Sequence, residues 1–319
     1  MREIGGYIEL DTYHLPMLHE DAAVALNCAR NALAYLLRAR KIRRLWVPKL
    51  ICSSVTDICS REGVPYSLYG IGMDLLPSEE VSLGDGEWFY FVNYYSQFSN
   101  EQIKTIAAKY GRVIVDNVQS YFQAPVPHVD TIYTCRKYFG VPDGAFLYTD
   151  AELTEELPTD VSFERMRHLL GRFEETASDH YREYTANEEA LSAEPIKRMS
   201  ALTNNLLRGI DYKRVKAVRE RNYRFLQNEL GGLNRLDLCD RAGTFMYPLL
   251  LENGAEIRKK LQERKIYVPT LWPDVFQTCS YSDTEYFLAG NILPLPVDQR
   301  YSLTDIQYMA REVVRCTSI

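Results

Sequence analysis

Short β-rich runs and helical stretches alternate along the first two-thirds of the chain. Amphipathic segments at residues 52–61 and 100–111 separate compact apolar or aromatic runs. The strands expected from those runs are residues 45–48, 65–71, 88–95, 112–117, 131–136 and 144–149. Because a strand–helix–strand repeat at this spacing builds parallel strand pairs, it predicts an α/β fold whose mostly parallel central sheet is sandwiched by helices.

The rest of the chain changes character. Residues 150–195 are acidic and helical in pattern, with no strand signal. Beyond them we expect helices near residues 210–230, 254–265 and 303–314, and a strand at 244–251. This predicts a large domain over residues 1–209 and a smaller α+β domain over residues 210–319, with the first residues, up to about residue 15, packed on the small domain.

Charge and composition exclude several classes of protein. The net charge of −6 argues against a dedicated nucleic-acid binder, which would carry a basic surplus. The sequence has no apolar run near the roughly 20 residues of a membrane span, and its first residues lack the pattern of a signal peptide. Seven scattered cysteines without a CxxC pair indicate reduced thiols, and five histidines show no metal-binding spacing. We therefore expect a cytoplasmic protein without a metal, a membrane segment or a nucleic-acid partner.

Polar residues follow the expected strands where an open parallel sheet binds its ligands. Asn93, Asp116 and the pair Thr134 and Lys137 stand at or just after such strand ends. A helix expected to begin near Arg30 would present free backbone N–H groups, which suit a phosphate. Each feature also has an ordinary interpretation: a helix start, a turn aspartate and a solvated surface lysine.

The three features together predict a specific cofactor. Pyridoxal phosphate needs an anion site for its phosphate, an acid that keeps its pyridine nitrogen protonated, and a lysine that holds its aldehyde as a Schiff base. The helix start near Arg30, Asp116 and Lys137 supply these groups in that order.

The sequence resembles the DegT/DnrJ/EryC1/StrS family of sugar aminotransferases, which are fold-type I enzymes dependent on pyridoxal phosphate. The segments that carry the resemblance are IGGYIEL (4–10), NCARNAL (27–33), VPKLICSSV (47–55), VDNVQS (115–120), TCRKYFGVPDGAFLY (134–148), KRMSALTNNLL (197–207) and NILPLPVDQRYSLTDIQYMA (291–310). The resemblance implies the fold of the aspartate-aminotransferase type.

The resemblance assigns roles around the cofactor. Lys137 would form the Schiff base and act as the general base, Asp116 would bind the pyridine nitrogen, and Gln119 would lie beside the ring. Backbone N–H groups of Arg30 and Asn31 would bind the phosphate.

Further positions follow from the same resemblance. Thr134 would donate its hydroxyl to the phosphate, and Asn93 would lie near the ring hydroxyl. Cys52 stands where the family often has an aromatic residue or histidine stacked on the ring, and Tyr94 or Tyr95 would cover part of the ring instead.

The resemblance also implies a homodimer and a reaction. Arg198 would reach the active site of the neighbouring subunit. An amino-acid donor, glutamate in the family, would supply nitrogen to a keto acceptor, which we expect to be a nucleotide-linked keto-sugar of polysaccharide biosynthesis. Two alternatives stay open: a lyase or decarboxylase that uses the same cofactor, and a non-catalytic protein with a degraded site, which Cys52 and Ile196 would fit.

Overall fold

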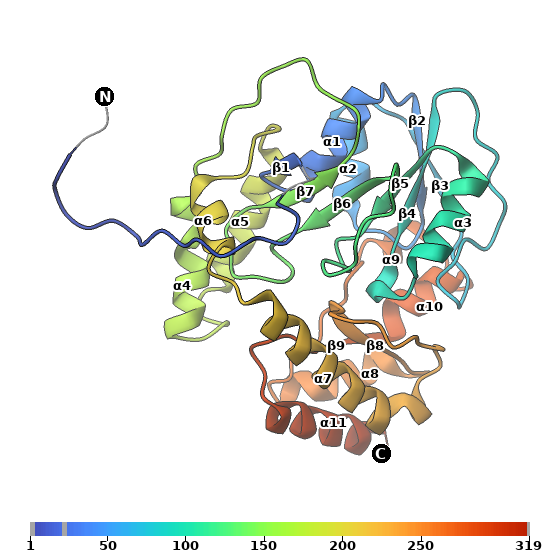
Figure 1. Ribbon diagram of the computed structural model, residues 1–319. Helices are drawn as coiled ribbons and strands as arrows, with labels where there is room; N and C mark the ends of the chain where they lie inside the picture. Colours follow the sequence, from blue (N-terminus) through green and yellow to red (C-terminus); the bar gives the residue numbers. More distant parts are fainter. Residues whose placement is uncertain (1–3, 21–23, 318–319) are drawn as a thin grey trace.

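A seven-stranded mixed sheet forms the main body of the computed structural model, which describes residues 4–20 and 24–317 (Figure 1). Its strands are β1 (Val24–Leu26), β2 (Arg44–Pro48), β3 (Tyr66–Tyr69), β4 (Glu87–Val92), β5 (Val113–Asp116), β6 (Asp130–Thr134) and β7 (Ala145–Tyr148). The strand order is β1-β7-β6-β5-β4-β2-β3. The pairs from β3 to β6 are parallel, and β7 is antiparallel to both β6 and β1. The predicted mostly parallel sheet is confirmed.

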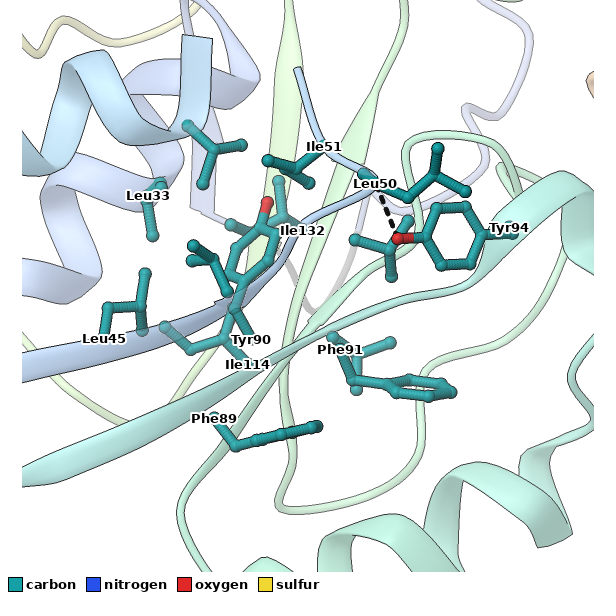
Figure 2. Close-up of a cluster of buried hydrophobic side chains, with 14 of the residues drawn as sticks. Leu33, Leu45, Leu50, Ile51, Phe89, Tyr90, Phe91, Tyr94, Ile114 and Ile132 are labelled. Atoms are coloured by element: carbon teal, nitrogen blue, oxygen red, sulfur yellow. Dashed lines mark hydrogen bonds between the residues drawn. The ribbon is translucent and has the colours of Figure 1, made fainter. Parts of the chain in front are cut away.

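Helices cover both faces of this sheet. Successive side chains of a strand point to opposite faces, so the apolar runs place apolar side chains on both. Tyr90 in β4 projects to the face opposite Phe89 and Phe91, on the side where Leu33 lies (Figure 2). Leu33 belongs to α1 (Ala29–Ala39), which packs on β6, β7 and α2 (Ser53–Arg61). On the other face, the ring of Phe89 stacks on Tyr110 of α3 (Asn100–Tyr110), with 4.0 Å between centroids.

The predicted strand over residues 88–95 is too long. β4 ends at Val92, and the chain turns into a short 3-10 helix at Tyr94–Ser96. Tyr95 and Ser96 have φ angles of 51° and 62°, in the left-handed region that non-glycine residues rarely adopt. A tertiary contact stabilises this turn, because Oε1 of Gln119 accepts a hydrogen bond from the Tyr95 N–H at 2.6 Å. The alternating aromatic pattern alone carries no sign of that contact.

A second, two-stranded sheet lies below the first (Figure 1). It pairs β8 (Met246–Leu250) with β9 (Ile292–Pro296) in antiparallel fashion, with its own apolar core. The helices around it are α7 (Tyr212–Leu230), α8 (Gly254–Glu263) and α11 (Leu303–Thr317). β9, which contains Pro294 and Pro296, is not among the expected strands. A two-stranded sheet tolerates prolines, since each strand leaves one edge unpaired. The boundary at residues 209 and 210 stays a prediction.

The acidic stretch over residues 150–195 is helical, as predicted. It contains a 3-10 helix at Phe163–Met166, α4 (Arg167–Glu174) and α5 (Tyr181–Ala193). The remaining helices are α6 (Ala201–Leu207), α9 (Val275–Thr278), α10 (Thr284–Asn291) and a 3-10 turn at Gly231–Leu233. Within the described residues, no helix combines the length and apolar character needed to cross a membrane.

The amino-terminal segment runs outward past α6 (Figure 1). Ile4, Tyr7 and Ile8 are almost fully exposed. The Tyr13 N–H donates to Oδ1 of Asn205 at 2.8 Å, which ties this segment to α6. The segment therefore lies against the predicted large domain and not, as expected, on the small one; residues 1–3 fall outside the described part.

Candidate active site

Asp116 and Lys137 come together at the carboxyl end of the parallel strands. Asp116 is the last residue of β5, and Lys137 follows the end of β6 by three positions. Asp116 is buried, with 5% of its surface exposed, whereas the Lys137 side chain is accessible to solvent. The two groups are close enough for each charge to shift the pKa of the other. The structure thus brings together the acid and the amine that the sequence predicts.

Burial shifts the pKa values of the two groups toward each other, and their opposite charges resist that shift. Although the Lys137 side chain is accessible to solvent, nearby protein atoms partly desolvate its ammonium and lower its pKa below the ordinary value, and the charges of Asp116 and Glu188 oppose that shift. Burial raises the pKa of Asp116, and the Lys137 charge opposes it. An amine with a lowered pKa has a larger neutral fraction near neutrality, and only the neutral amine can attack a carbonyl carbon.

Two hydrogen bonds hold the Asp116 carboxylate. The Tyr90 hydroxyl donates to Oδ2 at 2.8 Å, and the Val118 N–H donates to Oδ1 at 2.9 Å. Both bonds favour the ionised carboxylate against the effect of burial. Each carboxylate oxygen can accept a further hydrogen bond, so Asp116 can still receive a protonated ring nitrogen.

The Tyr90 hydrogen bond leads to a pH-dependent prediction. A carboxyl whose pKa is raised on folding makes the protein less stable as the pH climbs from its unfolded value, about 4, through the folded one. Tyr90→Phe removes a donor to this carboxylate, so the pKa of Asp116 should rise further, and the loss of stability should extend to higher pH and become larger. We expect the variant to be less stable by about 1.5–3 kcal/mol near neutral pH, and by clearly less near pH 4, as measured by urea unfolding.

A matched control is available on the neighbouring strand. The buried hydroxyl of Tyr69 donates to the Tyr90 carbonyl, a neutral acceptor, at 2.8 Å. Tyr69→Phe should therefore cost a similar amount at every pH. A stability difference for Tyr90→Phe that did not change with pH would contradict the role assigned to its hydroxyl.

The first turn of α1 offers backbone donors near β6. The helix follows Cys28, whose backbone is extended, and its first internal hydrogen bond runs from the Ala32 N–H to the Cys28 carbonyl at 3.0 Å. The preceding N–H groups, including those of Arg30 and Asn31, therefore have no acceptor within the helix backbone. Thr134 ends β6, on which α1 packs, and is 7% exposed.

The Asn31 side chain links two segments of the chain by hydrogen bonds. Its Nδ2 atom donates to the carbonyls of Glu194 and Pro195, at 3.1 and 2.7 Å, and Nη2 of Arg61 donates to its Oδ1 at 2.8 Å. These bonds attach the segment after α5 to the start of α1. The Asn31 side chain is therefore occupied by protein partners, and only its backbone N–H stays a predicted donor to a phosphate.

Other predicted positions are buried with internal partners. Asn93 donates to Oε1 of Gln123 at 2.8 Å and accepts from the Phe98 N–H at 3.0 Å, so its amide is committed to the turn after β4. Tyr94 and Tyr95 are each 1% exposed and pack edge-on against Trp272. The Tyr94 hydroxyl donates to the Leu50 carbonyl at 2.6 Å (Figure 2). The roles proposed for Asn93, Gln119 and the two tyrosines stay predictions.

Cys52 and Arg198 differ in their surroundings. Cys52 precedes α2, is partly exposed, and lies near enough to Lys137 to influence its pKa. The Arg198 backbone bridges Leu26 and Thr159, and its side chain is exposed. Cys52 therefore lies near Lys137, and Arg198 is exposed; the roles predicted for both residues stay predictions.

The second sheet contributes a residue that the sequence did not reveal. Nζ of Lys137 lies 5.5 Å from the ring centroid of Phe245, just before β8. Arg219 of α7, which is 1% exposed, donates to the Phe245 carbonyl at 3.2 Å and to the Tyr138 carbonyl at 3.4 Å. Gln299 also donates to the Tyr138 carbonyl, at 2.7 Å. These contacts join the loop after Lys137 to the second sheet.

Comparison with known proteins establishes the fold. No protein-family model and no curated protein sequence matches the chain. Among solved structures, the sugar aminotransferase CalS13 from Micromonospora echinospora is 14% identical with a TM-score of 0.62, covering 91% of this chain and 86% of its own. DesV from S. venezuelae, solved in complex with a ketimine intermediate, is 16% identical with a TM-score of 0.65, covering 92% and 84%. NtdA from Bacillus subtilis, solved with bound cofactor PMP, is 15% identical with a TM-score of 0.66, covering 93% and 73%.

The chain therefore has the fold of these aminotransferases along almost its whole length. The resemblance noted in the sequence is confirmed at the level of the fold. What the chain does with that fold depends on its own residues.

Proposed function

We propose that this chain is a pyridoxal-phosphate-dependent aminotransferase. It would move an amino group from an amino-acid donor, which we expect to be glutamate, to a keto-sugar. The observation that carries the proposal is the pairing of buried Asp116 with Lys137 at neighbouring strand ends. Similarity to sugar aminotransferases supports it. The linkage of the acceptor to a nucleotide and a role in polysaccharide biosynthesis are finer parts of the same proposal.

The residues at the site fit pyridoxal phosphate. The start of α1 has backbone N–H groups without helical acceptors, and in the described part of the chain the buried Nε of Arg30 has no hydrogen-bond partner. Donors of this kind suit a phosphate. Asp116 would hold the protonated pyridine nitrogen, and Thr134 would bind the phosphate. When bound, the cofactor supplies an electron sink for the bond next to the substrate nitrogen.

Lys137 would perform the proton transfers. Its lowered pKa provides a neutral Nζ that can accept a proton from the substrate carbon and later return it. The ring of Phe245, just before β8, lies 5.5 Å from Nζ and would form one wall of the site. The stabilised Asp116 carboxylate would keep the ring nitrogen charged throughout.

The proposal includes a cytoplasmic homodimer. Arg198 would contribute to the partner's site, which its exposed side chain permits. The exposed apolar residues of the amino-terminal segment are also suited to contact a second copy.

Cofactor binding followed by a half-reaction tests the function. Purified protein incubated with pyridoxal phosphate is expected to show a new visible absorption band, and borohydride should fix the pyridoxyl group on the peptide that contains Lys137. Glutamate should then convert the band to that of the amine form and release 2-oxoglutarate. Loss of carbon dioxide or water without amine exchange would indicate the lyase alternative, and no band with folded protein would indicate a non-catalytic one.

A further inference from the structure

Two arginines near Lys137 share one carboxylate. Nη2 of Arg30, in the first turn of α1, lies 3.2 Å from Oε2 of Glu188, and the guanidinium of Arg136 is hydrogen-bonded to Oε1 of the same residue. Glu188 belongs to α5, which comes from the acidic stretch of the sequence. Arg30 and Arg136, here called the arginine pair, thus meet where α5 approaches the start of α1.

This location carries more positive charge than Glu188 neutralises. Each arginine adds a full positive charge, the helix start adds a partial one, and the single carboxylate removes one. Burial raises the pKa of the Cys28 thiol at the helix start, but the charges of Arg30, Arg136 and Arg61 all oppose that effect. Their joint influence shows that a positive potential converges on this point.

The donors of the arginine pair exceed the acceptors that Glu188 provides. A guanidinium has five N–H donors, and a carboxylate can accept about four hydrogen bonds in total. Nε of Arg30 is buried, and no acceptor in the described part of the chain reaches it. An oxyanion would satisfy this donor and balance the remaining charge.

Glu188 is placed so that it can be displaced. Its side chain is 28% exposed, compared with 20% for Arg30 and 15% for Arg136, so the cluster is accessible to a ligand from solvent. Burial would raise the pKa of Glu188, but the two arginines outweigh burial and hold it below its usual range. The carboxylate is therefore an ionised competitor for the arginine pair.

We propose that the arginine pair binds an oxyanion, and that Glu188 competes with this ligand for the two guanidinium groups. Arg136 directly precedes Lys137, and Arg30 lies at the predicted phosphate site. The anion is therefore the phosphate of the cofactor or an acidic group of the substrate. That identity rests on the proposed function, whereas the anion site itself does not.

The first experiment measures inorganic phosphate binding to the cofactor-free protein by calorimetry. Glu188→Gln removes the competing charge and should lower the Kd for phosphate about fivefold. Glu188→Asp keeps the charge on a shorter side chain and should lie between wild type and Glu188→Gln. Arg136→Met should weaken phosphate binding about tenfold.

The matched control is Glu189→Gln, which makes the same charge change at an exposed position one residue further along α5. It should leave the Kd for phosphate unchanged. If Glu188→Gln only lowered the melting temperature, without tighter phosphate binding, the carboxylate would be a structural ion-pair partner and the proposal would be overturned. If Glu189→Gln tightened binding equally, the effect would come from overall charge, with the same consequence.

The second experiment distinguishes the sources of the anion. If the arginine pair holds the cofactor's phosphate, Glu188→Gln should tighten pyridoxal phosphate but not pyridoxal, and the cofactor-loaded protein should no longer respond to phosphate or glutarate. If the pair holds an acidic substrate group, the loaded Glu188→Gln protein should still bind phosphate or glutarate more tightly than loaded wild type.

The two proposals can fail separately. Tighter phosphate binding by Glu188→Gln in a protein that binds no pyridoxal phosphate would keep the anion site and reject the proposed cofactor. Normal attachment of the cofactor to Lys137, with no effect of Glu188→Gln on any anion, would keep the function and reject the competition.

Discussion

Replacing Lys137 with alanine is expected to abolish covalent attachment of pyridoxal phosphate and to lower the rate of amine transfer by at least about 10³-fold. The variant loses both the amine that would bond to the cofactor aldehyde and the base that would move the proton. Absorption spectra with borohydride trapping measure the first loss, and single-turnover kinetics with glutamate measure the second. The fold should persist, because the Lys137 side chain is solvent accessible and fills no part of the core.

The control for this variant is Lys213→Ala, at an exposed position of α7. It should retain cofactor attachment and activity. Normal turnover by Lys137→Ala would contradict the mechanism, since no other residue is assigned both tasks.

Asp116→Asn is expected to keep part of the cofactor affinity and to slow the proton-transfer step by about 10²–10⁴-fold. The asparagine oxygen can still accept from the Val118 N–H, and its amide nitrogen can donate to the Tyr90 hydroxyl, so the turn after β5 should survive. The side chain would, however, lack the charge that keeps a ring nitrogen protonated. Stopped-flow measurement of the glutamate half-reaction at saturating pyridoxal phosphate separates the rate from the affinity.

Asp116→Asn also leads to an expectation for the stability of the protein. Asparagine removes a buried carboxylate whose pKa is raised by burial, so the variant should be no less stable than wild type near neutral pH. An unchanged half-reaction rate in this stable variant would reject the role of Asp116 at the ring nitrogen.

Strand periodicity predicted that Asp116 and Lys137 come together, and the structure places them close to each other. The carboxyl ends of parallel strands meet at one edge of a sheet, so residues at the ends of two adjacent strands are close whatever the loops do. The helix start at Arg30 is predictable for a similar reason, since a helix after a strand in such folds begins at that same edge.

The residues that contact this site could not be predicted from the sequence. Tyr90 lies in an aromatic run that predicts only a buried strand, and its hydroxyl meets Asp116 because β4 and β5 pair with Val92 opposite Asp116. Tyr94 and Tyr95 continue the same run, yet a left-handed turn buries them against Trp272. Strand register and that turn depend on contacts between distant segments.

The parallel sheet, the helical stretch after it, and the acid, amine and helix start of the proposed cofactor site can all be predicted from the sequence. Each of these follows from local periodicity and from the geometry shared by all parallel sheets. The three-dimensional structure was needed to show that Glu188, 52 positions from Arg136, lies between two arginines, and that the ring of Phe245 lies 5.5 Å from Nζ of Lys137. Such contacts form when separate elements pack through their apolar faces. The positions that packing gives to the polar residues of these elements cannot be predicted from local sequence patterns.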